Sequence, residues 1–167
     1  MRKLCAFLGL LAALSFASAA RAQDKVELFG GYSYLRLNDS PSHFNLNGWE
    51  LAGTYKFNGW LGGVADFSGH YGSPFGASIN QHNFLFGPQI SLPAPVSPFV
   101  HALVGVSELG GPGNSDHSFG AALGGGFDIH GGPFWNYRLF QVDDLVTHFG
   151  GRAQNDLRIS TGIILRF

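Results

Sequence analysis

The chain has 167 residues, of which 13% are charged, about half the share usual for a soluble domain. This length allows one domain, or one domain preceded by a processing segment. Seven basic and eleven acidic residues follow residue 22 and give a net charge of −4 with no basic run, which argues against nucleic acid as a partner.

Residues 1–22 are expected to be a cleaved signal peptide. Arg2 and Lys3 precede the apolar run Leu4 to Phe16, and Ala20-Arg21-Ala22 fits a cleavage site. The run is too short for a spanning helix, which needs about 20 residues. The single cysteine, Cys5, lies within this segment. The mature chain, 23–167, is therefore predicted to form no disulfide and to use no thiolate chemistry.

Eight segments with alternating apolar and polar residues follow, a period typical of strands with two unlike faces. In chain order they cover 25–37, 48–57, 60–71, 81–92, 99–107, 118–129, 135–147 and 155–167. Their lengths match the 9–11 residues or so that a tilted spanning strand needs. Because only helices and closed barrels satisfy their backbone in lipid, the pattern predicts an all-β fold: an eight-stranded antiparallel up-and-down transmembrane β-barrel.

The connectors between these segments alternate in length. Those near 58–59, 93–97 and 130–133 are short, and Asn58-Gly59 is a strong hairpin signal. Those at 38–47, 72–80, 108–117 and 148–154 are longer and rich in Gly, Ser, Asn and Pro. Short periplasmic turns and longer outer loops are typical of such barrels.

Two positions disturb the alternation. Pro88 removes a ladder donor in the fourth segment and is interpreted as a bulge. In the seventh segment Phe140 and Val142 are assigned to the lipid face, which leaves Asp144 pointing outward. A bulge near Asp143-Asp144 is predicted to correct this, because an extra residue re-aims everything after it.

The polar faces of the eight segments should line the lumen. They carry a predicted polar network: Glu50, Lys56, Asp66, Asp128, Asp143, Arg158 and Arg166, accompanied by Glu27, His70 and His101. Within it, Lys56, Arg166 and Asp128 are expected near the periplasmic end as a local ion-pair cluster. A barrel of eight strands is only wide enough for side chains to fill it, so these charges must pair with one another. A packed polar plug is the expectation, and a narrow ion path is the alternative.

Aromatic residues collect near the segment ends. The set predicted to lie at the membrane interfaces is Trp49, Tyr55, Trp60, Trp135 and Tyr137. Such girdles anchor a barrel at the level of the lipid headgroups. A sugar-stacking site is the alternative reading, but it lacks a neighbouring pair of carboxylates.

The last residues combine a glycine with alternating hydrophobics and a terminal aromatic: Gly162, Ile163, Leu165 and Phe167. This ending resembles the assembly signal of bacterial outer-membrane barrels, and the resemblance implies that the barrel-assembly machinery reads the last strand. With the motifs 30–34 (GGYSY) and 124–128 (GGGFD), the mature chain is similar to small eight-stranded barrels of the OmpA transmembrane-domain, OmpX and opacity-protein type. These motifs indicate architecture and not activity.

Catalytic and metal sites are not supported by the sequence. Asp116, His117 and Ser118 are adjacent, but neighbours on a strand point to opposite faces and cannot form a triad. No histidine has a serine two residues later, the spacing used by the lipid A deacylases that this chain resembles in size. His43, His117 and His148 lie in different predicted loops. No cofactor and no metal are expected.

The sequence therefore favours a non-enzymatic integral outer-membrane protein, with outer-membrane lipid and the assembly machinery as partners and a monomer as the expected state. Its role would be structural or surface display. One alternative is recognition of an extracellular partner through the loops, with these contact candidates: Phe44, Phe75, Phe149 and Arg152. Others are a small-solute channel and, least favoured, a lipid A-modifying enzyme. A soluble lipocalin-like barrel is disfavoured because it would need its apolar face inside.

Overall fold

A computed structural model describes residues 25–39, 42–73, 79–111, 114–149 and 152–167. The predicted signal peptide lies outside these residues. The strands are β1 (Val26–Asp39), β2 (Ser42–Lys56), β3 (Leu61–Gly72), β4 (Ile79–Ser91), β5 (Val96–Gly111), β6 (Asn114–His130), β7 (Trp135–Phe149) and β8 (Arg152–Arg166). Each pairs antiparallel with its neighbour in sequence, and β1 pairs with β8, so that the sheet closes. The predicted closed eight-stranded up-and-down barrel is confirmed.

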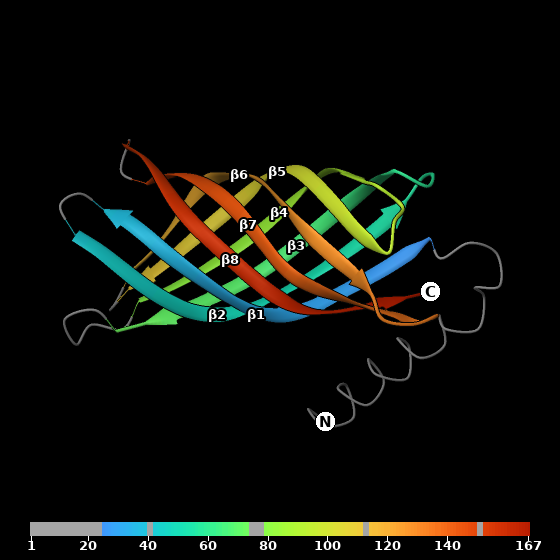
Figure 1. The fold of residues 1–167 in the computed structure, drawn as a ribbon. Helices are drawn as coiled ribbons and strands as arrows, with labels where there is room; N and C mark the ends of the chain where they lie inside the picture. Colours follow the sequence, from blue (N-terminus) through green and yellow to red (C-terminus); the bar gives the residue numbers. More distant parts are fainter. Residues whose placement is uncertain (1–24, 40–41, 74–78, 112–113, 150–151) are drawn as a thin grey trace, which may run out of the picture.

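Figure 1 shows the strands crossing the barrel at a marked tilt, with the end of β8 at the same end of the barrel as the start of β1. The connections 57–60, 92–95 and 131–134 lie at this end, which we call the short-turn end. The opposite end is called the far end. Around the short-turn end, Val26 and Phe167 exchange two backbone hydrogen bonds that close the wall. Among the described residues, no helix is long and apolar enough to cross a membrane.

The two faces of the wall differ as the alternation predicts. Large apolar side chains such as Leu51, Phe86 and Leu123 are exposed on the outside, whereas Glu50, Asp66 and Arg158 are at most 1% exposed inside. Apolar side chains share the interior with these charges, among them Leu35, Leu46, Leu103 and Leu145. The molecule therefore has an apolar exterior and a filled interior that contains its charges, which is the arrangement suited to lipid.

The strands extend further toward the far end than predicted. β1 and β2 pair as far as Asp39 and Ser42, and β5 and β6 as far as Gly111 and Asn114. Much of what the sequence suggested as loop at 38–47 and 108–117 is therefore strand. The prediction was wrong because a strand that continues beyond the lipid layer no longer needs an apolar face, so the alternation that marks it disappears.

The predicted bulge at Asp143-Asp144 is wrong. The register shifts earlier in β7, between Arg138 and Gln141, and both Leu139 and Phe140 face outward. Asp144 consequently keeps its outward position. The predicted bulge at Pro88 is also wrong, because the β4–β5 register is the same before and after it. Pro88 lies opposite Gly63 on the outer face.

Candidate functional site: the polar lumen

Arg158 is the centre of the lumen. Its guanidinium donates two parallel hydrogen bonds to Asp66, of 2.9 and 3.1 Å, and a third from Nε to Asp143 Oδ2 at 2.8 Å. Glu50 Oε2 lies 3.7 Å from Nε. All four side chains are at most 1% exposed. One cation from β8 thus joins carboxylates from β2, β3 and β7, and the fork of the arginine suits such paired acceptors.

A glycine on the neighbouring strand β6 gives this cluster its space. A Cβ added at Gly124 would stand 1.9 Å from Asp143 Oδ1, so no larger residue fits beside this carboxylate. Over this glycine, Asp143 Oδ1 lies 2.8 Å from His101 Nε2 of β5, the register partner of Gly124 on its other side. The glycine-rich stretch of β6 therefore admits a carboxylate that two basic groups contact.

Gln141 connects the central cluster with a second ion pair. Its amide nitrogen donates to Glu50 at 2.9 Å and to Asp143 at 2.7 Å, while its oxygen accepts from Arg138 at 2.6 Å. Arg138 in turn donates to both oxygens of Asp128, at 2.8 and 3.1 Å. The polar network is thus continuous from the short-turn side of the lumen to its middle.

Arg138 also lies between two aromatic rings. Its guanidinium carbon is 4.5 Å from the ring centroid of Phe29 and 4.1 Å from that of Phe99. Both rings are buried, so these cation–π contacts are made away from water, where they are strongest. The two rings and the guanidinium belong to β1, β5 and β7, so these contacts join three strands inside the lumen.

Hydroxyl groups continue the network toward β1 and β3. Ser160 donates to Glu50 Oε2 at 2.5 Å and lies 2.9 Å from Ser33, whose oxygen is 2.9 Å from His70 Nε2. Ser68 accepts from Arg158 at 3.1 Å. These serine hydroxyls give Glu50 a donor and Arg158 a further acceptor, and buried polar groups require such partners.

The remaining predicted lumen residues lie at the short-turn end. Lys56 contacts Glu27 at 2.9 Å, and Arg166 approaches the same carboxylate oxygen at 3.7 Å. They border a cavity of about 580 Å3, to which Asp128 also contributes. Of the seven predicted network residues, Glu50, Asp66 and Asp143 therefore surround Arg158 in the middle, and Lys56 and Arg166 approach Glu27 at the mouth. Asp128 borders the cavity but pairs with Arg138.

Sequence reasoning missed Arg138, and it turned Gln141 inward without including it in the network. A signal for both was present. Trp135 and Tyr137 were assigned to the exterior, as was Phe140, and these assignments are compatible only if an extra residue stands between 137 and 140. Placing the bulge there turns Arg138 and Gln141 inward together.

The bulge in β7 is completed by a residue on the outer face. Thr161 Oγ1 donates to the carbonyl oxygen of Arg138 at 3.0 Å and lies 2.9 Å from the hydroxyl of Tyr137. A bulge interrupts the ladder and leaves backbone groups without their usual partners. The threonine hydroxyl supplies one such partner on a face that is otherwise apolar.

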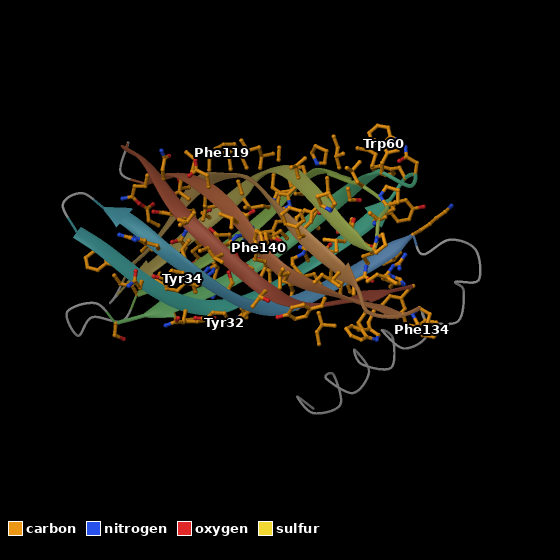
Figure 2. The ribbon with its side chains drawn as sticks, viewed as in Figure 1. Tyr32, Tyr34, Trp60, Phe119, Phe134 and Phe140 are labelled. Atoms are coloured by element: carbon orange, nitrogen blue, oxygen red, sulfur yellow. The ribbon has the colours of Figure 1, made fainter. Side chains whose placement is uncertain are left out.

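The predicted interfacial aromatics lie on the exterior. Tyr55, Trp60, Trp135 and Tyr137 are 39–50% exposed near the short-turn end. Trp49 lies higher on the wall, half-buried over Gly69 and in edge contact with Phe67 at 5.2 Å. In Figure 2 the side chains of Trp60, Phe119 and Phe134 project away from the barrel.

The residues of the predicted assembly signal belong to β8 and its end. Ile163 and Leu165 are exposed on the outer face, and Gly162 faces Gly31 of β1 so closely that a Cβ would stand 2.3 Å from the Gly30 carbonyl oxygen. Phe167 follows the strand and pairs with Val26 through the backbone.

Neither a metal site nor a triad is formed by the described residues. No group of three or more His, Asp or Glu among them could hold a metal ion. Asp116, His117 and Ser118 follow one another along β6, so their side chains alternate between faces. Phe44 is half-buried in β2 and is not in a loop. The side chains of His43, His148, Phe149 and Arg152, and all of Phe75, lie outside the described residues.

No family model matches the chain, and no curated protein matches it in sequence. Solved structures do match. The fold is that of the small outer-membrane barrels. Neisserial surface protein A is similar over 86% of this chain and 97% of its own, with 12% identity and a TM-score of 0.66. Ail, the attachment invasion locus protein of Yersinia pestis, is similar over 87% of this chain and 100% of its own, with 17% identity and a TM-score of 0.61. The N-terminal β-barrel domain of Pseudomonas aeruginosa OprF is similar over 86% and 98%, with 9% identity and a TM-score of 0.57.

Proposed function

We propose that this protein is an integral protein of the bacterial outer membrane that acts as a closed, non-catalytic barrel, in an envelope-structural or display role. The observation that carries the proposal is the filled lumen. Arg158 binds Asp66 across it, Arg138 pairs with Asp128 of the neighbouring strand, and Arg138 contacts the buried rings of Phe29 and Phe99. An apolar exterior around such an interior is suited to anchoring and does not offer a reaction site.

The environment follows from the exterior. Exposed leucines, valines and phenylalanines surround the wall, and the aromatic residues near the short-turn end fit one membrane interface. The short turns would then face the periplasm, and the far end would face the outside. Gly162, Ile163, Leu165 and Phe167 would serve the barrel-assembly machinery as the recognition strand.

Conductance of the refolded protein in planar bilayers tests this proposal against a channel. We expect no resolved openings from the wild-type protein. Arg138→Ala is the informative variant, because it removes the guanidinium between the two rings and should allow small ion currents. Arg36→Ala is the control, because it removes the same charge from the outer face of β1, and this variant should show no conductance. Steady conductance from the wild-type protein would reject the closed barrel.

Surface recognition is the second candidate, favoured by the length of the strands. β5 and β6 continue to Gly111 and Asn114, and they carry the polar residues Glu108, Asp116 and His117 toward the far end. One structure of Ail is a complex with the heparin analogue sucrose octasulfate. In this chain the described far-end segments of β5 and β6 are acidic, so a partner with basic or neutral groups is the better fit. Substitution of Glu108 and Asp116 by lysine should abolish such binding without changing envelope integrity.

A further inference from the structure

The short-turn end of the barrel contains a cavity that the closed-barrel function does not use. It has a volume of about 580 Å3 and is bordered by strand ends and turns from around the mouth. Its charged lining consists of Lys25, Lys56 and Arg166 with Glu27 and Asp128. Arg138, which contacts the Phe29 and Phe99 rings, links this lining to the central network through Asp128.

The charges in this cavity do not balance. Both oxygens of Asp128 accept hydrogen bonds from Arg138, so that carboxylate is already matched by a cation from deeper in the lumen. Among the described residues that line the cavity, Glu27 is the carboxylate that both Lys56 and Arg166 approach, at the same oxygen, Oε1. Lys25 adds a further cation at the rim. The described residues that line the mouth thus carry more positive than negative charge, in a chain whose mature part is acidic.

The cations are held in place. Glu27 is 5% exposed and Lys56 and Arg166 are each 22% exposed, so the group is largely shielded from bulk water. Arg166 Nη1 also lies 3.3 Å from His130 Nδ1, which is 3.1 Å from the side-chain oxygen of Asn136. His130 and Asn136 border the same cavity and offer further polar groups. Pre-positioned cations with adjacent donors are what recognition of phosphate or carboxylate requires.

We propose that this cavity binds an anionic ligand bearing phosphate or carboxylate groups, held by Lys56 and Arg166. The volume admits a molecule larger than a single phosphate. The two cations would turn from their shared carboxylate toward the ligand, while Glu27 opposes binding by competing for them. Removing a cation must therefore weaken binding, whereas removing the Glu27 charge must strengthen it.

Inorganic pyrophosphate is the probe for the test, titrated at constant ionic strength into the refolded protein in a maltoside micelle, which carries no phosphate. Calorimetry gives the affinity, and NMR shifts of the His130 ring and the Asn136 side-chain amide locate the site. The expected result is saturable binding with shifts at both residues. Lys56→Met should weaken it roughly tenfold or more, the scale of one charge-assisted hydrogen bond.

Glu27→Gln is the decisive variant, because it should tighten binding roughly tenfold, an outcome that loss of folded structure cannot produce. Arg36→Met is the matched control, since it changes the net charge as Lys56→Met does but on the outer face of β1. The proposal is overturned by absence of saturable binding, by weakening in Glu27→Gln, or by an equal loss in Arg36→Met. Heat-modifiable gel migration of each variant establishes that the barrel has folded.

A phospholipid headgroup could supply the same phosphate chemistry as a soluble anion. Nanodiscs of phosphatidylglycerol and of phosphatidylcholine distinguish the two sources. If pyrophosphate binds equally in both, the ligand is a soluble anion. If phosphatidylglycerol alone shifts His130 and Asn136 and excludes pyrophosphate, the cavity takes the anionic lipid headgroup, which also satisfies the proposal.

Discussion

Arg158 on β8 and Asp66 on β3, 92 residues apart in the chain, meet in the lumen through two parallel hydrogen bonds. These strands are not neighbours in the sheet, so no ladder holds them at this distance. The pair therefore connects opposite parts of the barrel wall through the lumen. Glu50 and Asp143 contact the same guanidinium at this level.

Arg158→Met should be the most destabilising single change in the lumen. It leaves Glu50, Asp66 and Asp143 buried without their shared cation, which typically costs about 3–5 kcal/mol. Urea unfolding of the protein refolded in micelles, followed by tryptophan fluorescence, measures the free energy. Arg36→Met on the exterior is the control and should change it by less than about 0.5 kcal/mol. Equal effects of the two changes would show that the ion pairs of Arg158 with Glu50, Asp66 and Asp143 do not stabilise the barrel.

The double change Arg158→Met with Asp66→Asn should be less destabilising than the sum of the two single changes. Once the cation is gone, neutralising Asp66 removes one uncompensated charge, so the second substitution partly rescues the first. A coupling free energy of about 1–3 kcal/mol is expected for residues in one network. Strict additivity in the same unfolding experiment would mean that the two side chains do not interact.

Thr161→Val should destabilise the barrel by about 1–2 kcal/mol, because the bulge carbonyl of Arg138 loses its donor on a face without water. Thr147→Val is the matched control: the Thr147 hydroxyl is buried and has no partner among the described residues. Its loss should be neutral or stabilising. Indistinguishable unfolding midpoints for the two valine variants would contradict this role of Thr161.

Asp144→Ala should stabilise the protein in lipid bilayers. Asp144 is exposed on the outer face of β7 between Val142 and Val146, and a carboxylate on the lipid face is unfavourable by up to about 2 kcal/mol, depending on depth. The free energy of unfolding in vesicles is the measurement. Asp116→Ala, at the far end of β6, should have no such effect. A loss of stability in Asp144→Ala would argue against lipid at this position.

Phe167→Ala should reduce the amount of barrel assembled in cells while leaving refolding in vitro nearly unchanged. The reason is that the terminal aromatic would be read by the assembly machinery, whereas a half-buried residue after β8 adds little packing. Phe134→Ala, an exposed phenylalanine at the same end, is the control for lost hydrophobic area. If both variants assemble to the wild-type level, the signal does not depend on Phe167.

The sequence predicted the faces of the wall well because a strand in lipid must alternate. Trp49 and Glu50 are neighbours on a strand, so their side chains must lie on opposite faces, the tryptophan outside and the glutamate inside. The same holds for Leu157 and Arg158. The bulge was misplaced because the Asp143-Asp144 pair is conspicuous. Leu139 and Phe140 are both apolar, so the extra residue is shown only by the outward assignment of both Tyr137 and Phe140. The far ends of β1, β2, β5 and β6 were missed because strand beyond the lipid layer does not need an apolar face and so loses the alternation.

The contacts between side chains within the lumen could not be predicted from the sequence for a different reason. Alternation gives the face of a residue but not its height, which depends on the stagger between strands. Lys56, Arg166 and Asp128 were predicted as one ion-pair cluster near the periplasmic end, but the partners differ in the structure. Lys56 and Arg166 pair with Glu27, whereas Asp128 pairs with Arg138. The sandwich of Arg138 between Phe29 and Phe99 joins three strands and needs their relative heights.

The orientation of the wall is the central claim, and paramagnetic quenching in nanodiscs tests it most directly. A nitroxide on the lipid acyl chains should broaden the NMR signals of Leu51, Phe86 and Leu165 side chains, and a water-soluble gadolinium chelate should not. The Arg158 guanidinium should be protected from both. Strong broadening of Leu51, Phe86 and Leu165 by the chelate, with none by the lipid nitroxide, would contradict the account.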